Sequence, residues 1–349
     1  MTLAARGAAL VTPGGASTTS DKLSRTLRDL RVSVTDRCNL RCRYCMPREV
    51  FGRDHVFLPN DEILSFEEIT RLARTATDLG VRKIRLTGGE PLLRRELETL
   101  VAMLRELDGV ELALTTNGAL LARAAEALRA AGLDRVTVSL DALDDATFWQ
   151  MTDSRLPVAR VLEGIDAAIA AGLAPVKVNM VVRRGVNEQA VLPMARYFKE
   201  SGQILRFIEF MDVGETNRWR RDEVMAGEEI VELIDREMPL TPVPRTYPGE
   251  VANRFRYSDG IGEIGVIASV TQPFCGNCTR ARISADGRLY TCLFASRGHD
   301  VKALLRGGVD DKELAVFLAG VWHRRSDRYS EVRASGAVAP KAEMSYLGG

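Results

Sequence analysis

The cysteines of this chain fall into two groups of three, and no cysteine stands alone. The members are Cys38, Cys42 and Cys45 in the first group and Cys275, Cys278 and Cys292 in the second. Six cysteines in a small secreted chain would suggest three disulfides. This chain has 349 residues, with enough apolar residues for a core of its own. The two groups therefore indicate metal-ligand sets.

The first group follows a predicted strand, within SVTDRCNLRCRYCMP. Three thiolates on one tight loop can hold three irons of a [4Fe-4S] cube and leave the fourth iron open. An open iron can chelate the amino and carboxylate groups of S-adenosylmethionine (SAM), and reduction of the sulfonium then yields a 5′-deoxyadenosyl radical. The alternative is a structural zinc site with a fourth ligand from elsewhere. Zinc sites more often use paired CxxC or Cys/His sets, and the chain has only three histidines.

The second group again offers three thiolates, which suggests a second cluster whose open iron binds substrate. A structural zinc site or an electron-relay cluster with another ligand is the alternative. Directly after Cys278 comes Thr279-Arg280-Ala281-Arg282. In an extended segment, residues two apart share a face, so both guanidinium groups can bind the same phosphate oxygens. A solvated basic strand is the simpler interpretation of this segment.

Further cations lie on the predicted strands, and the chain has no P-loop that would hold a nucleotide in the usual way. Arg31, Arg85 and Lys177 are the candidates for binding phosphate. Lys177 has the strongest case, because VKVNMVV is otherwise apolar and an inward lysine needs an anionic partner.

The overall composition excludes little. A formal net charge of +1 gives no argument for binding nucleic acid or an anionic membrane. No apolar run approaches the roughly 18 residues that cross a bilayer. Residues 1–22 contain a short apolar patch interrupted by Pro13, Gly14 and Gly15, a poor match to a signal peptide. We expect a disordered leader over 1–22 and a cytoplasmic protein.

Six β-rich runs alternate with helical patterns, which predicts a parallel α/β sheet. The expected strands are 30–35, 82–88, 111–118, 135–142, 176–182 and 206–213. Six units are too few for a closed eight-stranded barrel, so we expect an incomplete (βα)6 TIM-like barrel over 23–245. Ligands collect at the carboxyl ends of such strands. A proline-rich stretch marks a boundary near residue 245, followed by an α+β cluster-binding domain over 246–349.

Taken together, these motifs resemble one family. They are LRVSVTDRCNLRCRYCMP, IRLTGGEPLLR, LTTNG, VSLDA, VKVN, RFIEFMDVG, FCGNCTRARIS and the terminal YLGG. In this combination, covering about residues 25–349, the chain resembles the GTP 3′,8-cyclase family of the radical SAM superfamily. The resemblance implies a lyase-type enzyme of molybdenum cofactor biosynthesis with two [4Fe-4S] clusters, SAM and GTP. It further implies a homodimer, an external one-electron reductant, and a downstream cyclic pyranopterin monophosphate synthase.

The resemblance also assigns residues. SAM contacts carried over from the family are Tyr44, Gly89, Ser139 and Met211. GTP contacts carried over are Arg31, Arg85, Thr115, Lys177, Arg280, Ala281 and Arg282. The implied radical removes the 3′ hydrogen of GTP ribose, and the sugar radical then adds to guanine carbon 8. This gives 3′,8-cyclo-7,8-dihydroguanosine 5′-triphosphate.

The tail KAEMSYLGG ends in Gly348-Gly349, and a terminal Gly-Gly is usually a flexible end. Met344, Tyr346 and Leu347 could pack and so direct the tail inward, and the resembled family threads this dipeptide into its active-site cavity. We therefore expect Gly348 and Gly349 to help arrange the site, with Arg85 or another cation meeting the terminal carboxylate. Two rival functions remain: a peptide-modifying radical SAM enzyme, and a zinc-stabilised nucleotide-binding protein without catalysis.

Overall fold

Six parallel strands form the centre of one curved sheet, in the order in which they occur along the chain. They are β1 (Asp29–Ser33), β2 (Lys83–Thr87), β3 (Glu111–Thr116), β4 (Arg135–Ser139), β5 (Lys177–Val182) and β6 (Ile204–Glu209). The structure is a computed structural model that describes residues 18–247, 249–333 and 340–348. Each predicted strand is present, but the sixth ends at Glu209, so Met211 lies in the loop beyond it.

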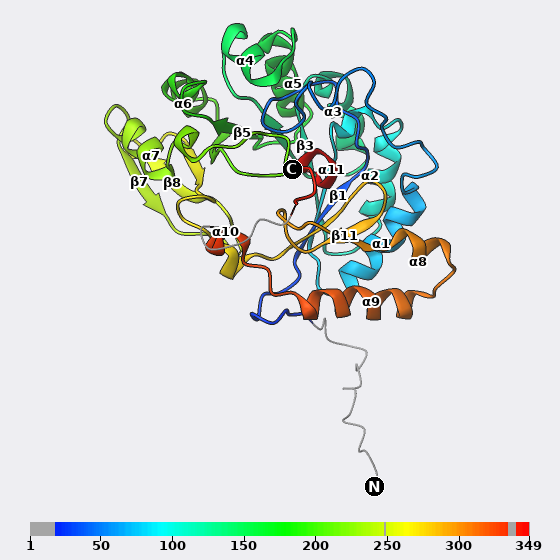
Figure 1. The fold of residues 1–349 in the computed structure, drawn as a ribbon. Coiled ribbons are helices and arrows are strands. Elements are labelled where there is room, and N and C mark those ends of the chain that lie inside the picture. The colour runs from blue at the N-terminus through cyan, green and yellow to red at the C-terminus, as the bar shows by residue number, and fades with distance from the viewer. Residues whose placement is uncertain (1–17, 248, 334–339, 349) are drawn as a thin grey trace.

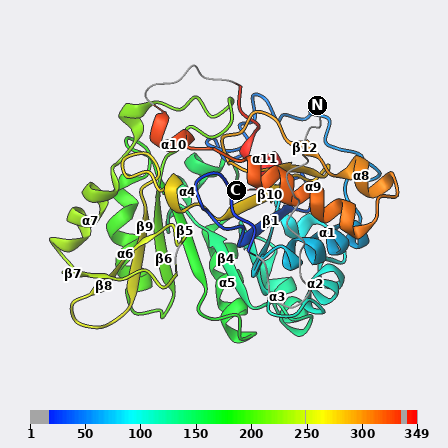
Figure 2. The same ribbon diagram turned by 90° about the horizontal axis from the view of Figure 1, so that it is seen from below.

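Helices cover the outer face of this sheet (Figure 1). They are α1 (Phe66–Asp78), α2 (Leu97–Arg105), α3 (Leu121–Ala130), α4 (Asp145–Thr152), α5 (Val158–Ala170), α6 (Val191–Lys199) and α7 (Gly227–Asp235). Helix α1 begins with a capping box: the Ser65 hydroxyl accepts from Glu68 N, and the Glu68 carboxylate accepts from Ser65 N. The expected incomplete (βα)6 barrel is thereby confirmed, and Figure 2 shows its strands running side by side.

The C-terminal segment extends both edges of the same sheet. Its strands are β7 (Leu240–Val243), β8 (Asn253–Tyr257), β9 (Glu263–Ile267), β10 (Arg280–Ile283), β11 (Arg288–Tyr290) and β12 (His299–Asp300). At one edge β9 pairs parallel with β6, and at the other β10 pairs parallel with β1. The result is one twelve-stranded sheet. The part predicted as a separate domain is thus continuous with the barrel sheet, and the boundary near 245 stays a prediction.

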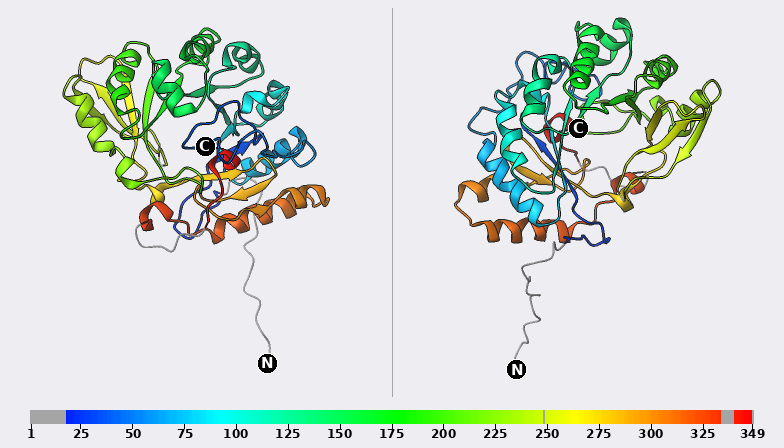
Figure 3. Two further views of the ribbon diagram at one scale, coloured as in Figure 1. Left: turned by 45° about the horizontal axis from the view of Figure 1, so that its top comes forward. Right: turned by 180° about the vertical axis from the view of Figure 1, so that it is seen from behind.

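The remaining helices lie across and inside the curve of the sheet (Figure 3). They are α8 (Lys302–Arg306), α9 (Asp311–Arg324), α10 (Tyr329–Val332) and α11 (Met344–Leu347), with short 3-10 turns η1 (Pro91–Leu93), η2 (Glu188–Ala190), η3 (Arg221–Glu223) and η4 (Cys275–Asn277). Helix α9 packs against α1, whereas α11 contacts β1 from inside the curve. Among the described residues, no helix is long and apolar enough to span a membrane.

The beginning of the described chain corrects the predicted leader. Residues 1–17 lie outside the described residues, but Thr19 and Asp21 are buried. Thr19 N donates to Leu79 O, and Thr19 O accepts from Leu27 N. The prediction of disorder is therefore wrong for this short stretch, because its backbone and the Asp21 side chain have partners in the fold.

Candidate functional site

A cavity of about 290 Å³ lies inside the curve of the sheet, and both cysteine groups line it. Of the residues predicted to bind SAM or GTP, the lining includes Arg31, Tyr44, Arg85, Gly89, Thr115, Ser139, Met211, Arg280 and Arg282. Residues more than 200 positions apart in the chain therefore share one space, and its size suits a small-molecule site.

The two cysteine groups lie at opposite ends of neighbouring strands. Cys38 follows the carboxyl end of β1, whereas Cys278 precedes the amino end of β10, which runs parallel to β1. Cys292 follows β11, which is antiparallel to β10 and so returns to the same edge. Strand β1 has five residues, or roughly 16 Å at 3.3 Å per residue. The two cysteine groups therefore line opposite ends of the cavity wall that these strands form.

The first cysteine group lies on a compact loop in which Cys45 N and Met46 N both donate to Cys42 O. Burial raises the pKa of the Cys38 thiol to about 11. Burial, followed by the neighbouring cysteines, also raises the pKa of Cys42 well above its ordinary value. Thiols in this environment become thiolates only if a positive centre lies among them, as in a bound metal cluster. The donor set therefore fits an iron–sulfur cluster.

Tyr44 is held in place by the loop that follows β4. Its hydroxyl donates to Asp141 Oδ2 at 2.8 Å, and Asp141 Oδ1 accepts from Val181 N. This links the cysteine loop to the ends of β4 and β5, beside Ser139 in the lining of the cavity. Sequence reasoning did not single out Asp141, although VSLDA was recognised as a motif.

The glycines of the TGGEP segment pack directly against the start of the first cysteine loop. A Cβ atom on Gly89 would lie 2.4 Å from Arg37 O, and one on Gly88 would lie 2.6 Å from Thr35 O. Gly89 N donates to Thr35 O as well. Only glycine permits this approach, which brings the backbone of the segment to the cavity wall.

Glu90 of the TGGEP segment joins two loops inside the protein. A carboxylate at this position would suit an ammonium group, but Glu90 is fully buried. Its carboxylate accepts from Thr116 Oγ1 and Asn117 N at 2.7 Å each. Burial raises the pKa of Glu90 to about 7. The residue joins the TGGEP segment to the LTTNG loop instead of facing the cavity.

A row of arginines crosses the cavity wall between the two cysteine groups. Strand register places Arg282 beside Arg31 and Arg31 beside Arg85. None of these three forms an ion pair with a carboxylate among the described residues. Burial, followed by the charges of Arg282 and Arg85, lowers the pKa of Arg31 well below its ordinary value. Arg282 is buried and Arg31 and Arg85 are half-buried, and like charges held together away from water without carboxylate partners constitute an anion site.

Three further predicted GTP contacts, Arg280, Thr115 and Ala281, differ in what their side chains contact. Arg280 Nη2 donates to Cys278 Sγ at 3.1 Å, so this arginine contacts the second cysteine group directly. Thr115 Oγ1 accepts from Arg85 Nη1 at 2.9 Å. Ala281 lies between the two arginines of β10, so its side chain points to the opposite face and packs in the core.

Lys177 lies at the amino end of β5, on the face that two residues later carries the cavity-lining Asn179. Lys177 itself does not line the cavity. Burial, followed by the charge of Arg206, lowers the pKa of Lys177 to about 7. Arg206 does line the cavity, its Nε is buried without a partner, and β6 pairs it with Asn179. Sequence reasoning missed Arg206, although it is an isolated cation in an apolar strand, the same signal that identified Lys177.

The second cysteine group has its own electrostatic environment. Although burial acts in the opposite direction, Arg280 and Arg325 lower the pKa of the Cys278 thiol to about 6. Burial raises the pKa of Cys292 to about 11. All six cysteines are free thiols. Among the described residues, no three His, Cys, Asp or Glu side chains are arranged to hold a single metal ion.

The tail enters the cavity as its sequence predicts. Met344 lines the cavity and Leu347 is fully buried, whereas the Tyr346 ring packs edge-on against Tyr290. Gly348 has a φ of 70°, and a Cβ atom there would lie 1.9 Å from Thr87 Oγ1. The tail backbone thus lies against the TGGEP segment, while Gly349 lies outside the described residues.

Comparison with known proteins agrees with this site. Residues 32–198 match the radical SAM superfamily model, and residues 203–331 match the model described as Molybdenum Cofactor Synthesis C. A crystal structure of Streptococcus suis SuiB bound to S-adenosylmethionine has the same fold, with a TM-score of 0.60 and 15% identity over 90% of this chain and 69% of that one.

Curated relatives are much more similar to this chain. The GTP 3′,8-cyclase of Acidothermus cellulolyticus is 55% identical over 94% of this chain and 98% of its own length. That of Staphylococcus saprophyticus is 49% identical over 95% and 98%. Identity of this extent over nearly the whole of both chains, together with the fold and the two cysteine groups, shows that this chain belongs to the GTP 3′,8-cyclase family of radical SAM proteins.

Proposed function

We propose that this protein is a GTP 3′,8-cyclase that catalyses the first step of molybdenum cofactor biosynthesis, a lyase-type reaction. Its product is 3′,8-cyclo-7,8-dihydroguanosine 5′-triphosphate. One observation carries this proposal beyond family membership: a row of buried and half-buried arginines without carboxylate partners among the described residues crosses a cavity that has a cysteine group at each end. A triphosphate supplies the anionic charge that this row needs.

The end of the cavity at Cys38, Cys42 and Cys45 is the proposed site of the first cluster and SAM. When bound there, a [4Fe-4S] cluster and SAM supply the 5′-deoxyadenosyl radical that removes the 3′ hydrogen of GTP. Gly89 brings backbone to the SAM site, Tyr44 and Ser139 line it, and Met211 reaches it from the loop after β6.

The opposite end is the proposed site of a second [4Fe-4S] cluster, held by Cys275, Cys278 and Cys292. Arg280 Nη2 donates to Cys278 Sγ, and this positive charge favours the thiolate that binds metal. Three thiolates would leave one iron of such a cluster open for guanine, and the arginines would bind the phosphates of GTP. The proposed phosphate ligands are Arg31, Arg85, Thr115, Lys177, Arg280 and Arg282, with Ala281 contributing backbone only.

The activity is tested by anaerobic incubation with SAM, a one-electron reductant and each nucleoside triphosphate in turn. Mass analysis should find the cyclised product from GTP together with 5′-deoxyadenosine. Product from a peptide and none from GTP would favour the peptide-modifying alternative. A colourless, iron-free protein after anaerobic purification would favour the zinc-stabilised alternative.

The two clusters are tested separately by two triple alanine variants, one for each cysteine group. Each variant should retain about half of the roughly eight irons expected for two clusters. Loss of the first group should abolish SAM cleavage. Loss of the second should leave some SAM cleavage uncoupled from product. Retention of about eight irons by either variant would contradict the assignment.

We also propose that the enzyme is a homodimer that receives electrons from an external one-electron reductant and supplies cyclic pyranopterin monophosphate synthase. Membership of the family supports these partners. Light scattering of the reconstituted protein should give twice the 38.4 kDa chain mass, and a monomeric mass would contradict the dimer.

A further inference from the structure

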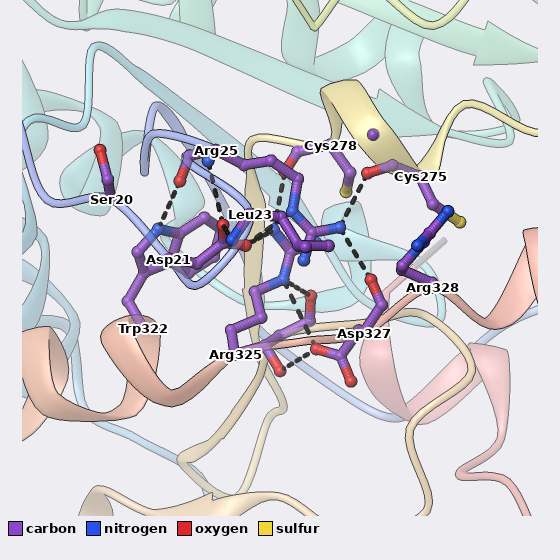
Figure 4. Close-up of polar contacts among 12 residues, drawn as sticks. Ser20, Asp21, Leu23, Arg25, Cys275, Cys278, Trp322, Arg325, Asp327 and Arg328 are labelled. Carbon is purple, nitrogen blue, oxygen red and sulfur yellow. Dashed lines mark hydrogen bonds and ion pairs between the residues drawn. The ribbon is translucent and has the colours of Figure 1, made fainter.

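Two buried arginines that do not belong to the row of Arg282, Arg31 and Arg85 bind the loops of the second cysteine group (Figure 4). Arg25 comes from the N-terminal segment, and Arg325 follows α9. The side chains of both are almost completely buried, as is that of Asp21, which lies between them. Asp21 Oδ2 accepts from Arg25 Nε at 2.6 Å and from Arg325 Nη1 at 3.1 Å.

Each of these arginines binds backbone carbonyls of the loops that carry the cysteines. Arg25 Nη1 donates to Cys275 O at 2.8 Å. Arg325 Nη1 donates to Cys278 O at 2.7 Å, and Arg325 Nε donates to Thr291 O, next to Cys292, at 3.1 Å. All three cysteine positions are therefore fixed by two guanidinium groups that share one carboxylate.

One donor of this triad has no partner. Arg25 Nη2 is buried and forms no hydrogen bond among the described residues, and Arg25 lines the cavity together with the second cysteine group. The two guanidinium groups face two carboxylates, since Arg325 Nε also forms an ion pair with the partly exposed Asp327 at 3.5 Å. A buried N–H without an acceptor is costly. The sulfur atoms of a cluster bound by three thiolates would supply that acceptor to Arg25 Nη2.

We propose that Asp21, Arg25 and Arg325 are positioning residues for the second cluster: the two guanidinium groups fix the cysteine loops and place positive charge and a free N–H beside the cluster. This inference rests on the proposed second cluster. Asp21 lies in the stretch predicted as a disordered leader. That stretch is thus part of the cluster site, because Asp21 N also donates to Arg25 O and Lys22 N donates to Arg325 O.

The test uses the full-length C38A/C42A/C45A variant, in which the second cluster is the only one expected. We add Arg25→Gln, Arg25→Lys, Arg325→Gln or Asp21→Asn and measure iron content, electron paramagnetic resonance and midpoint potential. The glutamine variants should either lose most of the iron or keep a cluster with a shifted electron paramagnetic resonance spectrum and a lower midpoint potential. The potential falls because positive charge near a cluster stabilises its reduced form. Arg25→Lys keeps the positive charge but not the guanidinium hydrogen bonds. Compared with Arg25→Gln, it should therefore restore the midpoint potential more than the iron content.

Arg105→Gln is the matched control, because Arg105 also pairs with an aspartate, Asp134, and binds carbonyls, but on the outer side of the barrel. Spectra and potentials of the Arg25 and Arg325 variants that match this control would overturn the inference. Absence of any cluster in the parent triple variant would overturn the second cluster itself, and the inference with it.

A variant that lacks the second cysteine group tests whether Arg25 merely supports the fold of the whole protein. In C275A/C278A/C292A, which retains only the first cysteine group, Arg25→Gln should leave the iron content unchanged. Loss of iron there would overturn a specific role. Two truncations of the wild-type chain add an independent measurement: removal of residues 1–17 should keep about eight irons, whereas removal of 1–22 should keep about four. Equal iron content in both truncations would contradict the role of Asp21.

Discussion

At the scale of single residues, the feature that matters most is the row formed by Arg282, Arg31 and Arg85. Strand pairing places their side chains at one level, and no carboxylate among the described residues pairs with them. Holding three cations together, one buried and two half-buried, costs free energy that an anionic ligand can offset. The protein is therefore arranged for a ligand that carries several negative charges.

Arg282→Ala should weaken GTP binding about tenfold or more, because a charge-assisted contact contributes about 1.5–3 kcal/mol. Arg282 is preferable to Arg280 for this measurement, because Arg280 also contacts Cys278 Sγ. Arg288→Ala is the control, since Arg288 lies two strands from β1 and pairs with Asp286. Equal GTP affinity of the two variants by calorimetry, with normal iron content, would contradict the phosphate role.

As a proposed phosphate ligand, Lys177 should make GTP binding depend on pH. Its pKa in the free protein is lowered to about 7, and a bound phosphate favours the charged form and so raises that pKa. Between pH 7 and the raised value the complex holds more protons than the free protein. Binding should therefore take up protons, and GTP affinity should fall as pH rises through this window.

Calorimetry at about pH 8 in buffers of different ionisation enthalpy measures this proton uptake. At this pH the terminal phosphate, with a pKa near 6, is already ionised and does not contribute. Lys177→Arg stays charged and should abolish the uptake while retaining binding. If proton uptake persists in Lys177→Arg, another group takes up the proton and the prediction for Lys177 is wrong.

At the scale of elements, the short helix α11 determines where the tail runs. Glu343 precedes this helix, and its carboxylate accepts from Glu215 N and from Thr216 Oγ1. Leu347 is buried at its end. The helix thus delivers Gly348 to Thr87 at a position where a side chain does not fit.

Deletion of Gly348 and Gly349 should leave both clusters and GTP affinity nearly intact while cyclisation nearly stops, because the tail arranges the site without holding the fold. Gly348→Ala should act in the same direction. Gly308→Ala is the control: its φ of 81° is also positive, but no atom lies within 4 Å of the added Cβ. Full product formation by the truncated enzyme would show that the tail has no part in the reaction.

At the scale of the whole molecule, one sheet crosses the boundary that the sequence suggests near residue 245. Strands β9 and β10 pair with β6 and β1, so removal of the C-terminal segment would expose both edges of the barrel sheet. Exposed edges of this kind promote aggregation. The two parts are therefore expected to depend on each other for stability.

The full-length protein should unfold in one cooperative transition, observed with the same midpoint by circular dichroism and by tryptophan fluorescence. A fragment of residues 18–245 should be aggregated or show no cooperative transition. Two separate transitions in the full-length protein, or a stably folded fragment, would establish two independent domains.

Local sequence was sufficient for several features. The spacing of each cysteine group, the glycines of TGGEP and the capping box at Ser65 and Glu68 act between neighbours in the chain, so they can be interpreted without a fold. The alternation of strands and helices predicted the barrel for the same reason. Side chains alternate between the two faces of a strand, so residues two apart share a face. For this reason Arg280 and Arg282 were expected to point in the same direction.

Other features depended on contacts between distant segments. The register of β10 beside β1 placed Arg282 next to Arg31, and nothing in either segment specifies that pairing. The role of Glu90 was set by Thr116 and Asn117, whose N–H and O–H groups bind the carboxylate inside the protein. Asp21, Arg25 and Arg325 are ordinary charged residues in sequence. They form a triad because β10 and α9 bring chain segments some 300 residues apart into contact, and burial then obliges the charges to find partners.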